Sequence, residues 1–294
     1  MQQAFPNASD FREQARKALK PNLSTAAMIM FLASLPGLIS SAVRSIALTD
    51  PLNRVYQLLL NFMADSTVTE ATLEANLMQV LTEASQDRMV ILSGVLSVVV
   101  WLVVPFLSLG LIASLMKLLR GEAVAPSDVL CRRGCFLKAI GLQLYVGLRE
   151  LLWMVPGIAV MVLSVPVLYW LQNLSVFQLM YFGGLLLVLV LGLRAALHYS
   201  QAEMLMAEHP EARIRDCLHD SVMIMHHRKK YLVLLYCSFA GWMLLAYVLN
   251  SLTSGINTVL GLLCEMIVSL ALNLYMNTAM TAFFLHYERQ PDEM

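Results

Sequence analysis

The stretch that decides the fold is residues 89–116, which read MVILSGVLSVVVWLVVPFLSLGLIASLM. It carries no charged side chain, and a helix of about 20 mostly apolar residues is long enough to cross the hydrocarbon core of a bilayer. The whole chain has the same character, because 59% of its 294 residues are hydrophobic and 14% are charged. Soluble domains have about 45–50% and about 25%. The sequence therefore predicts an all-α, polytopic membrane helix bundle.

Further apolar stretches on both sides of this segment bring the expected number of transmembrane helices to about six. The expected segments are a cytoplasmic amphipathic helix over 1–22, a first span over 23–43, an extracytoplasmic helical hairpin over 44–88, a second span over 89–116, a cytoplasmic or interfacial segment over 117–150, a third span over 151–171, a fourth over 179–197, a cytoplasmic amphipathic helix over 198–230, a fifth span over 231–250, a sixth over 256–280 and a cytoplasmic tail over 281–294.

The distribution of basic residues predicts the orientation of these spans. If both termini lie in the cytoplasm, only Arg44, Arg54 and Arg88 lie outside, and Arg149 lies at the edge of the third span. Segments rich in Lys and Arg stay on the cytoplasmic side of a membrane. We therefore expect a multi-pass protein whose N- and C-termini are both cytoplasmic.

The start of the third span has two interpretations. A helix from residue 139 to 170 would be longer than the hydrocarbon core is thick, so a kink at Pro156 or a turn along the interface is expected. If residues 136–148 lie along the inner interface, Arg149 and Glu150 are interfacial; if they belong to the span, both are buried. The interfacial placement is the favoured one.

Two segments outside the spans show the signals of short helices. In the N-terminal one, Asp10 is expected to cap a surface-lying amphipathic helix, with Glu13 completing a capping box. In the outer hairpin, Asp50 is expected to open the first helix and Thr67 with Glu70 to cap the second. The apolar face of the hairpin is interpreted as a cap on the outer ends of the spans, or alternatively as a lid or a receptor for an outside partner.

The sixth span carries a polar strip. Its members follow one another at intervals of four: Glu265, Ser269, Asn273, Asn277 and Thr281. Residues four apart share one ridge of a helix, so this strip must face protein or water rather than lipid. The hydroxyl and amide members are expected to bond to neighbouring helices, whereas Glu265 has either a structural or a transport role. We expect Glu265 to be protonated and packed inside the bundle.

The inner segment before the fifth span contains a candidate docking helix over residues 211–225. An apolar stripe of Ile214, Leu218, Val222 and Met225 lies beside a charged face. This stripe is expected to bind either the chain's own membrane core or a cytoplasmic protein partner.

Signatures of enzymatic chemistry are missing from the sequence. It contains no phosphate-binding glycine loop, no His-Glu-x-x-His and no Gly-x-Ser-x-Gly. Cys131, Cys135, Cys217 and His219 can be assembled into a zinc site only with loose spacing, so free thiols are the favoured interpretation. No catalytic residue, metal site or cofactor is expected, and equal counts of 20 basic and 20 acidic residues argue against a nucleic-acid partner.

Most of the chain from Arg120 onward, together with the N-terminal helix, resembles the bacterial integral membrane family called domain of unknown function 975. The residues that carry the resemblance are Ser238-Phe239-x-Gly241-Trp242-x-Leu244-Leu245, Leu252-Thr253-x-Gly255-Ile256, Leu19-Lys20-x-Asn22, Tyr199-Ser200, Met204-Leu205, Ala207-Glu208-x-Pro210, Ser221, Tyr275 and Phe283-Phe284. The chain departs from the family at Leu274, where proline is usual, and in a longer apolar stretch from Pro156 to His198. The resemblance implies a bacterial plasma membrane and no established activity.

Two classes of function follow from these features, and neither is enzymatic. The first is a transport or permease-like membrane component whose pathway uses the polar strip. The alternative is a non-transporting membrane scaffold or accessory protein, in which the strip holds helices together and the inner helix docks a cytoplasmic partner. Its partners are then the lipid bilayer and either a cytoplasmic protein or further copies of the chain.

Overall fold

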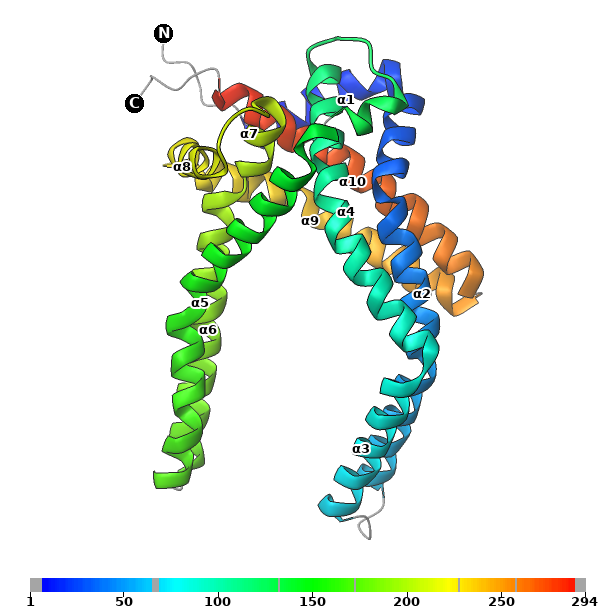
Figure 1. The fold of residues 1–294 in the computed structure, drawn as a ribbon, viewed down its shortest axis with the longest axis vertical. Helices are drawn as coiled ribbons and strands as arrows, with labels where there is room; N and C mark the ends of the chain where they lie inside the picture. The colour runs from blue at the N-terminus through cyan, green and yellow to red at the C-terminus, as the bar shows by residue number, and fades with distance from the viewer. Residues whose placement is uncertain are drawn as a thin grey trace. The chain divides into compact units, whose positions relative to one another are not determined.

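The computed structural model describes residues 7–64, 69–131, 133–171, 173–226, 228–256 and 258–288. All regular structure in these ranges is helical (Figure 1). The α-helices are α1 (Ala8–Leu19), α2 (Leu23–Ala64), α3 (Glu70–Gln86), α4 (Arg88–Leu119), α5 (Phe136–Leu171), α6 (Leu174–Tyr199), α7 (Ala202–Glu208), α8 (Ile214–Met225), α9 (Lys229–Ile256) and α10 (Thr258–Glu288). Short 3-10 helices cover Lys20–Asn22, Pro126–Leu130 and Arg133–Cys135.

Six helical segments within the described residues are long and apolar enough to cross a membrane. They lie in α2, α4, α5, α6, α9 and α10. The predicted all-α fold with about six membrane-spanning helices is therefore confirmed. The chain divides into two compact units, one formed by Met1–Phe31 with Phe106–Met294 and the other by Leu32–Pro105.

Several helices are longer than the sequence indicated. The predicted helix start at Asp50 is wrong, because α2 continues through both Pro36 and Pro51. The hydroxyl groups of Ser45 and Thr49 donate to carbonyl oxygens of the preceding turn, at 2.8 and 2.6 Å. At the other end of the chain, α10 continues past Met280 to Glu288.

Helix α5 runs without a break from Phe136 to Leu171, with Pro156 and Pro166 inside it. Residues 136–148 therefore continue directly into the third candidate span instead of forming a separate interfacial helix. The side chain of Arg149 is exposed, and its guanidinium donates to the Tyr145 hydroxyl at 3.0 Å, one turn earlier in the same helix.

Helices α5 and α6 lie side by side along their length (Figure 1). Glycines make this close approach possible. A Cβ atom at Gly157 would lie 2.7 Å from the Val188 backbone nitrogen, and one at Gly184 would lie 2.9 Å from the Met161 nitrogen. Small residues of this kind let the backbones of membrane helices approach closely and pack by van der Waals contact.

The caps of two helices differ from the predicted ones by a few residues. Helix α1 begins at Ala8, and Asp10 accepts from the Asn7 backbone N–H at 2.8 Å, so Asp10 is the third helical residue and not the cap. Helix α3 is capped by Thr69, whose hydroxyl accepts from the Thr72 N–H at 3.4 Å. The predicted cap Thr67 lies outside the described residues.

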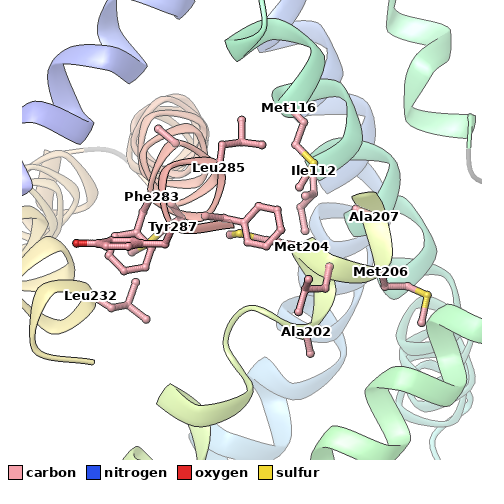
Figure 2. Packing of buried hydrophobic residues seen from close by; sticks show 14 of the residues in the cluster. Ile112, Met116, Ala202, Met204, Met206, Ala207, Leu232, Phe283, Leu285 and Tyr287 are labelled. Carbon is pink, nitrogen blue, oxygen red and sulfur yellow. The ribbon is translucent and has the colours of Figure 1, made fainter. Parts of the chain in front are cut away.

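The hydrophobic core of the first unit gathers side chains from α1, α4, α5, α7, α8, α9 and the last turns of α10. Figure 2 shows labelled side chains of α4, α7, α9 and α10 converging in this core. The apolar face predicted for the N-terminal helix is real, because Phe11, Ala15 and Leu19 are buried. It packs on protein, since the Phe11 ring lies 5.4 Å from the Phe283 ring of α10.

The second unit is a helical hairpin made by parts of α2 and α4 with α3. An exposed ion pair joins its two arms, with 2.7 Å between Arg54 Nη1 and Glu83 Oε2. In the apolar face predicted for the first arm of this hairpin, Leu52, Tyr56 and Leu59 are exposed, whereas Val55 and Phe62 are half-buried. That face is therefore only partly covered within the unit itself.

Candidate functional site

The polar strip predicted on the sixth span lies along α10, and its two ends have different surroundings. Glu265 and Asn273 are exposed, Ser269 and Asn277 are half-buried, and Thr281 is buried in the core. The prediction that Glu265 packs inside the bundle is therefore wrong for the single chain. The strip winds around α10, so its last turns face the core while its first turns do not.

The hydroxyl members of the strip are satisfied within α10 itself. Ser269 donates to the Met266 carbonyl oxygen at 3.1 Å, and Thr281 donates to the Asn277 carbonyl oxygen at 2.8 Å. Neither hydroxyl group therefore needs a hydrogen-bond acceptor on a neighbouring helix. The exposed members of the strip that need polar or protein surroundings in a membrane are the Glu265 carboxyl and the Asn273 amide, and the amide of the half-buried Asn277 needs a polar partner as well.

The candidate docking helix is α8, and its apolar stripe is used by the chain itself. Leu218 and Met225 are fully buried, while Ile214 and Val222 are half-buried. The helix contacts α5, α6 and α7 in the same unit. The stripe was expected to bind either the chain's own core or a cytoplasmic partner, and in the structure it packs on the chain's own core.

Ser221 joins α8 to the turn between α6 and α7, a role that the sequence did not reveal. Its hydroxyl donates to the His198 carbonyl oxygen at 2.9 Å and accepts from the Gln201 backbone N–H at 3.2 Å. Both Ser221 and Gln201 are buried. The only sequence signal was a lone hydroxyl on the apolar side of an amphipathic helix, which is a weak indication of a structural bond.

Helix α7 is the most deeply buried short element, and it carries an acidic residue that sequence reasoning missed. Ala202, Met204, Leu205, Met206 and Ala207 are all buried. Between them, Glu203 accepts a hydrogen bond from the Ser108 hydroxyl of α4, with 3.1 Å between the oxygens. A carboxyl group in such apolar surroundings is costly without a partner. This bond fixes α7 against α4.

The end of α7 is tied to three other elements by polar contacts. Arg120, which follows α4, pairs with Glu208 at 2.6 Å, and His209 lies 3.3 Å from Glu288 at the end of α10. The Lys138 ammonium of α5 donates to the Pro210 carbonyl oxygen at 2.7 Å. The hydrogen bond that the Arg120 guanidinium donates to the Glu208 carboxylate raises the pKa of Arg120 above its ordinary value. These contacts hold one end of the unit together.

The cysteines proposed for an alternative zinc site have different surroundings. Cys131 is exposed, Cys135 is half-buried and Cys217 is buried in α8. Burial raises the pKa of the Cys217 thiol, and the nearby Asp220 and Asp216 add to this effect. A buried thiol with a raised pKa is a poor nucleophile. Among the residues that the structure describes, no three His, Cys, Asp or Glu side chains form a group able to hold a metal ion.

These observations define an all-helical membrane protein whose polar and amphipathic elements mostly serve its own core. A family model described as "Protein of unknown function (DUF975)" matches residues 6–290 of the chain. The match covers nearly all of the sequence, so the chain belongs to this family of uncharacterised function. No curated protein and no solved structure matches it.

Proposed function

We propose that this protein is a non-catalytic membrane scaffold that self-associates through the exposed polar strip of α10. In this proposal it is a multi-pass protein of the bacterial plasma membrane with both termini in the cytoplasm. The basic residues of the sequence support that orientation. The single observation that carries the scaffold function is the exposure of Glu265 and Asn273 on one chain.

The physical argument rests on the cost of polar groups in lipid. Glu265 and Asn273 lie on the face of α10 that the chain's own core does not cover, inside a helix apolar enough to span the membrane. Such groups pair with one another or with a neighbouring helix, because hydrocarbon offers them no hydrogen bond. A second copy brings an identical strip, so Asn273 can bond to its counterpart in a symmetric dimer.

The use of α8 supports the same proposal. A scaffold that recruits a cytoplasmic protein through an amphipathic helix needs that helix to present its apolar stripe. Here Leu218 and Met225 are buried in the chain's own core. Association through α10 within the membrane therefore has better support than recruitment through α8.

The second candidate function is transport, and the exposure of Glu265 bears on it. An exposed Glu265 can line a solute pathway at an interface between chains, where a second copy supplies the other wall. In this form the transport candidate uses association through the same face of α10 as the scaffold. They differ in whether the ionisable carboxyl group of Glu265 is itself needed.

The first experiment measures the mass of the purified protein in mild detergent by light scattering. We expect the wild-type protein to be oligomeric and the double variant Glu265→Leu, Asn273→Leu to dissociate at concentrations roughly tenfold higher or more, since each interhelical hydrogen bond contributes about 1–2 kcal/mol. The matched control is Leu263→Ala, which changes an exposed apolar residue of α10 outside the polar strip. A monomeric wild-type protein, or association that the double variant leaves unchanged, would refute the proposal.

A second variant separates the two candidate functions. Glu265→Gln preserves the size and the hydrogen-bonding capacity of the side chain but cannot ionise. If the protein is a scaffold, this variant should associate normally and restore the wild-type phenotype to a deletion strain. If the protein is a proton- or cation-coupled transporter, the variant should associate normally and fail to restore it.

A further inference from the structure

A long groove lies in the first unit, on the side of α10 away from the polar strip. It has a volume of about 1290 Å³, which is larger than the roughly 300–1,000 Å³ typical of small-molecule pockets. Its walls come from the end of α1, the first turns of α2, and from α9 and α10. The apolar lining includes Leu23, Met28, Trp242, Ile267 and Leu274.

One end of this groove is basic. Arg16, Lys17 and Lys20, at the end of α1 and just after it, line that end. Lys17 already pairs with Glu13, whose carboxylate lies 2.7 Å from its ammonium group. Arg16 and Lys20 therefore give this rim its positive charge, while the remainder of the groove is apolar.

The groove has the length of one lipid leaflet. From Lys20 to Phe31 the chain rises about 16 Å at about 1.5 Å per helical residue, and half of a hydrocarbon core of about 30 Å is about 15 Å. Helix α2 begins at Leu23, directly after this basic rim, and contains a candidate membrane span. A basic rim at head-group level above an apolar channel matches the two halves of an anionic phospholipid.

We infer that this groove binds an anionic phospholipid, with the phosphate of the head group at Arg16 and Lys20 and an acyl chain along Leu23, Trp242 and Ile267. Each basic residue close to a membrane surface adds about 1 kcal/mol to the attraction of anionic lipid. The apolar walls contribute burial of the acyl chain, which is common to all phospholipids. The site therefore selects lipids by head-group charge.

Trp242 provides a direct probe because this residue is 56% exposed and lines the groove. A variant with Trp101→Phe, Trp153→Phe and Trp170→Phe leaves it as the sole tryptophan of the four. This full-length variant is reconstituted into phosphatidylcholine vesicles that contain acyl-brominated phosphatidylglycerol or acyl-brominated phosphatidylcholine at equal mole fractions. Bromine quenches indole fluorescence on contact. We expect brominated phosphatidylglycerol to quench half of the Trp242 fluorescence at a mole fraction about tenfold lower than the mole fraction of brominated phosphatidylcholine that has the same effect.

Charge variants test the basic rim. Arg16→Gln with Lys20→Gln should abolish the preference for phosphatidylglycerol. The matched control is Arg213→Gln with Arg215→Gln, which removes two exposed charges near the start of α8, outside the groove, and should keep the preference. Equal quenching by the two lipids in the parent protein would overturn the inference, as would a preference that survives Arg16→Gln with Lys20→Gln.

A groove-filling variant and a soluble competitor provide two further tests of the lipid site. If the charge variant does not fold, Ala271→Phe fills the apolar part of the groove from an exposed position and should reduce quenching by brominated phosphatidylglycerol. Unchanged quenching in that variant would also refute a lipid site. Soluble glycerol 3-phosphate should not relieve the quenching, because it lacks the acyl chains; relief would assign the rim to a free phosphate ester and overturn the lipid assignment.

Discussion

At the scale of single residues, glycines determine how closely elements of the first unit approach each other. Gly110 lies in α4 against the short 3-10 helix Pro126–Leu130. A Cβ atom at Gly110 would clash with the Val129 carbonyl oxygen, which belongs to the backbone and not to a flexible side chain. The position therefore tolerates only glycine unless the segment after α4 moves.

We therefore predict that Gly110→Ala destabilises the protein by about 1–3 kcal/mol, as overpacking of a tight core does. Gly94→Ala is the control in the same helix, because nothing lies within 4 Å of a Cβ built there. At that site alanine should be neutral or stabilising by up to about 1 kcal/mol through helix propensity. Unfolding midpoints measured in one detergent compare the two variants. A Gly110→Ala protein as stable as Gly94→Ala would refute a steric clash between residue 110 and Val129.

At the scale of elements, α8 shows how an amphipathic pattern finds its partner within the chain. Leu218 is only 5% exposed, whereas Met223 on the opposite side of the same helix is 53% exposed. Leu218→Asp places a carboxylate in the apolar core and should cost a few kcal/mol or abolish folding. Met223→Asp introduces the same group at the surface and should change the free energy of unfolding by about 0.5 kcal/mol or less.

The unfolding midpoint and the yield of monodisperse protein measure this difference. If Leu218→Asp folds with wild-type stability, α8 does not use its stripe in the core. In that case the loss or retention of co-purifying proteins would show whether the stripe binds a partner instead.

Local periodicity predicted element faces well and element lengths poorly. The buried sides of α1, at Phe11 and Ala15, and of α8, at Leu218 and Met225, follow the apolar spacing of the sequence. The break expected at Asp50 does not occur, because α2 continues through Pro51, which shows that a capping signal followed by proline does not end a helix by itself. The sequence also gave no sign of the Ser108–Glu203 bond, since its two residues are 95 positions apart.

The surroundings of Glu265 were the hardest feature to predict from the sequence. Its spacing with Ser269 and Asn273 correctly places these residues along one winding ridge of α10. The direction in which that ridge faces depends on how α9 and the inner core pack against α10, which periodicity does not encode. A polar strip in a span therefore predicts a need for polar surroundings, but not whether the same chain meets it.

At the scale of the whole molecule, the remaining prediction concerns the sides of the membrane on which the described segments lie. Candidate span α4 separates Ser85 in α3 from Ser127 in the 3-10 helix Pro126–Leu130, and both side chains are exposed. The segment that contains Ser85 is poor in basic residues, whereas basic residues flank Ser127 at Lys117 and Lys138. The positive-inside rule places Ser85 outside and Ser127 in the cytoplasm.

Single cysteines at these two positions, in a background where the five native cysteines are replaced by serine, test this topology with a membrane-impermeant maleimide. Ser85→Cys should be labelled on intact cells, and Ser127→Cys only after permeabilisation, which also shows that its thiol is accessible. The reverse result would invert the orientation and place the basic rim of the lipid groove in the outer leaflet. Labelling of both positions on intact cells would mean that α4 does not cross the membrane, and the six-span arrangement would then be wrong.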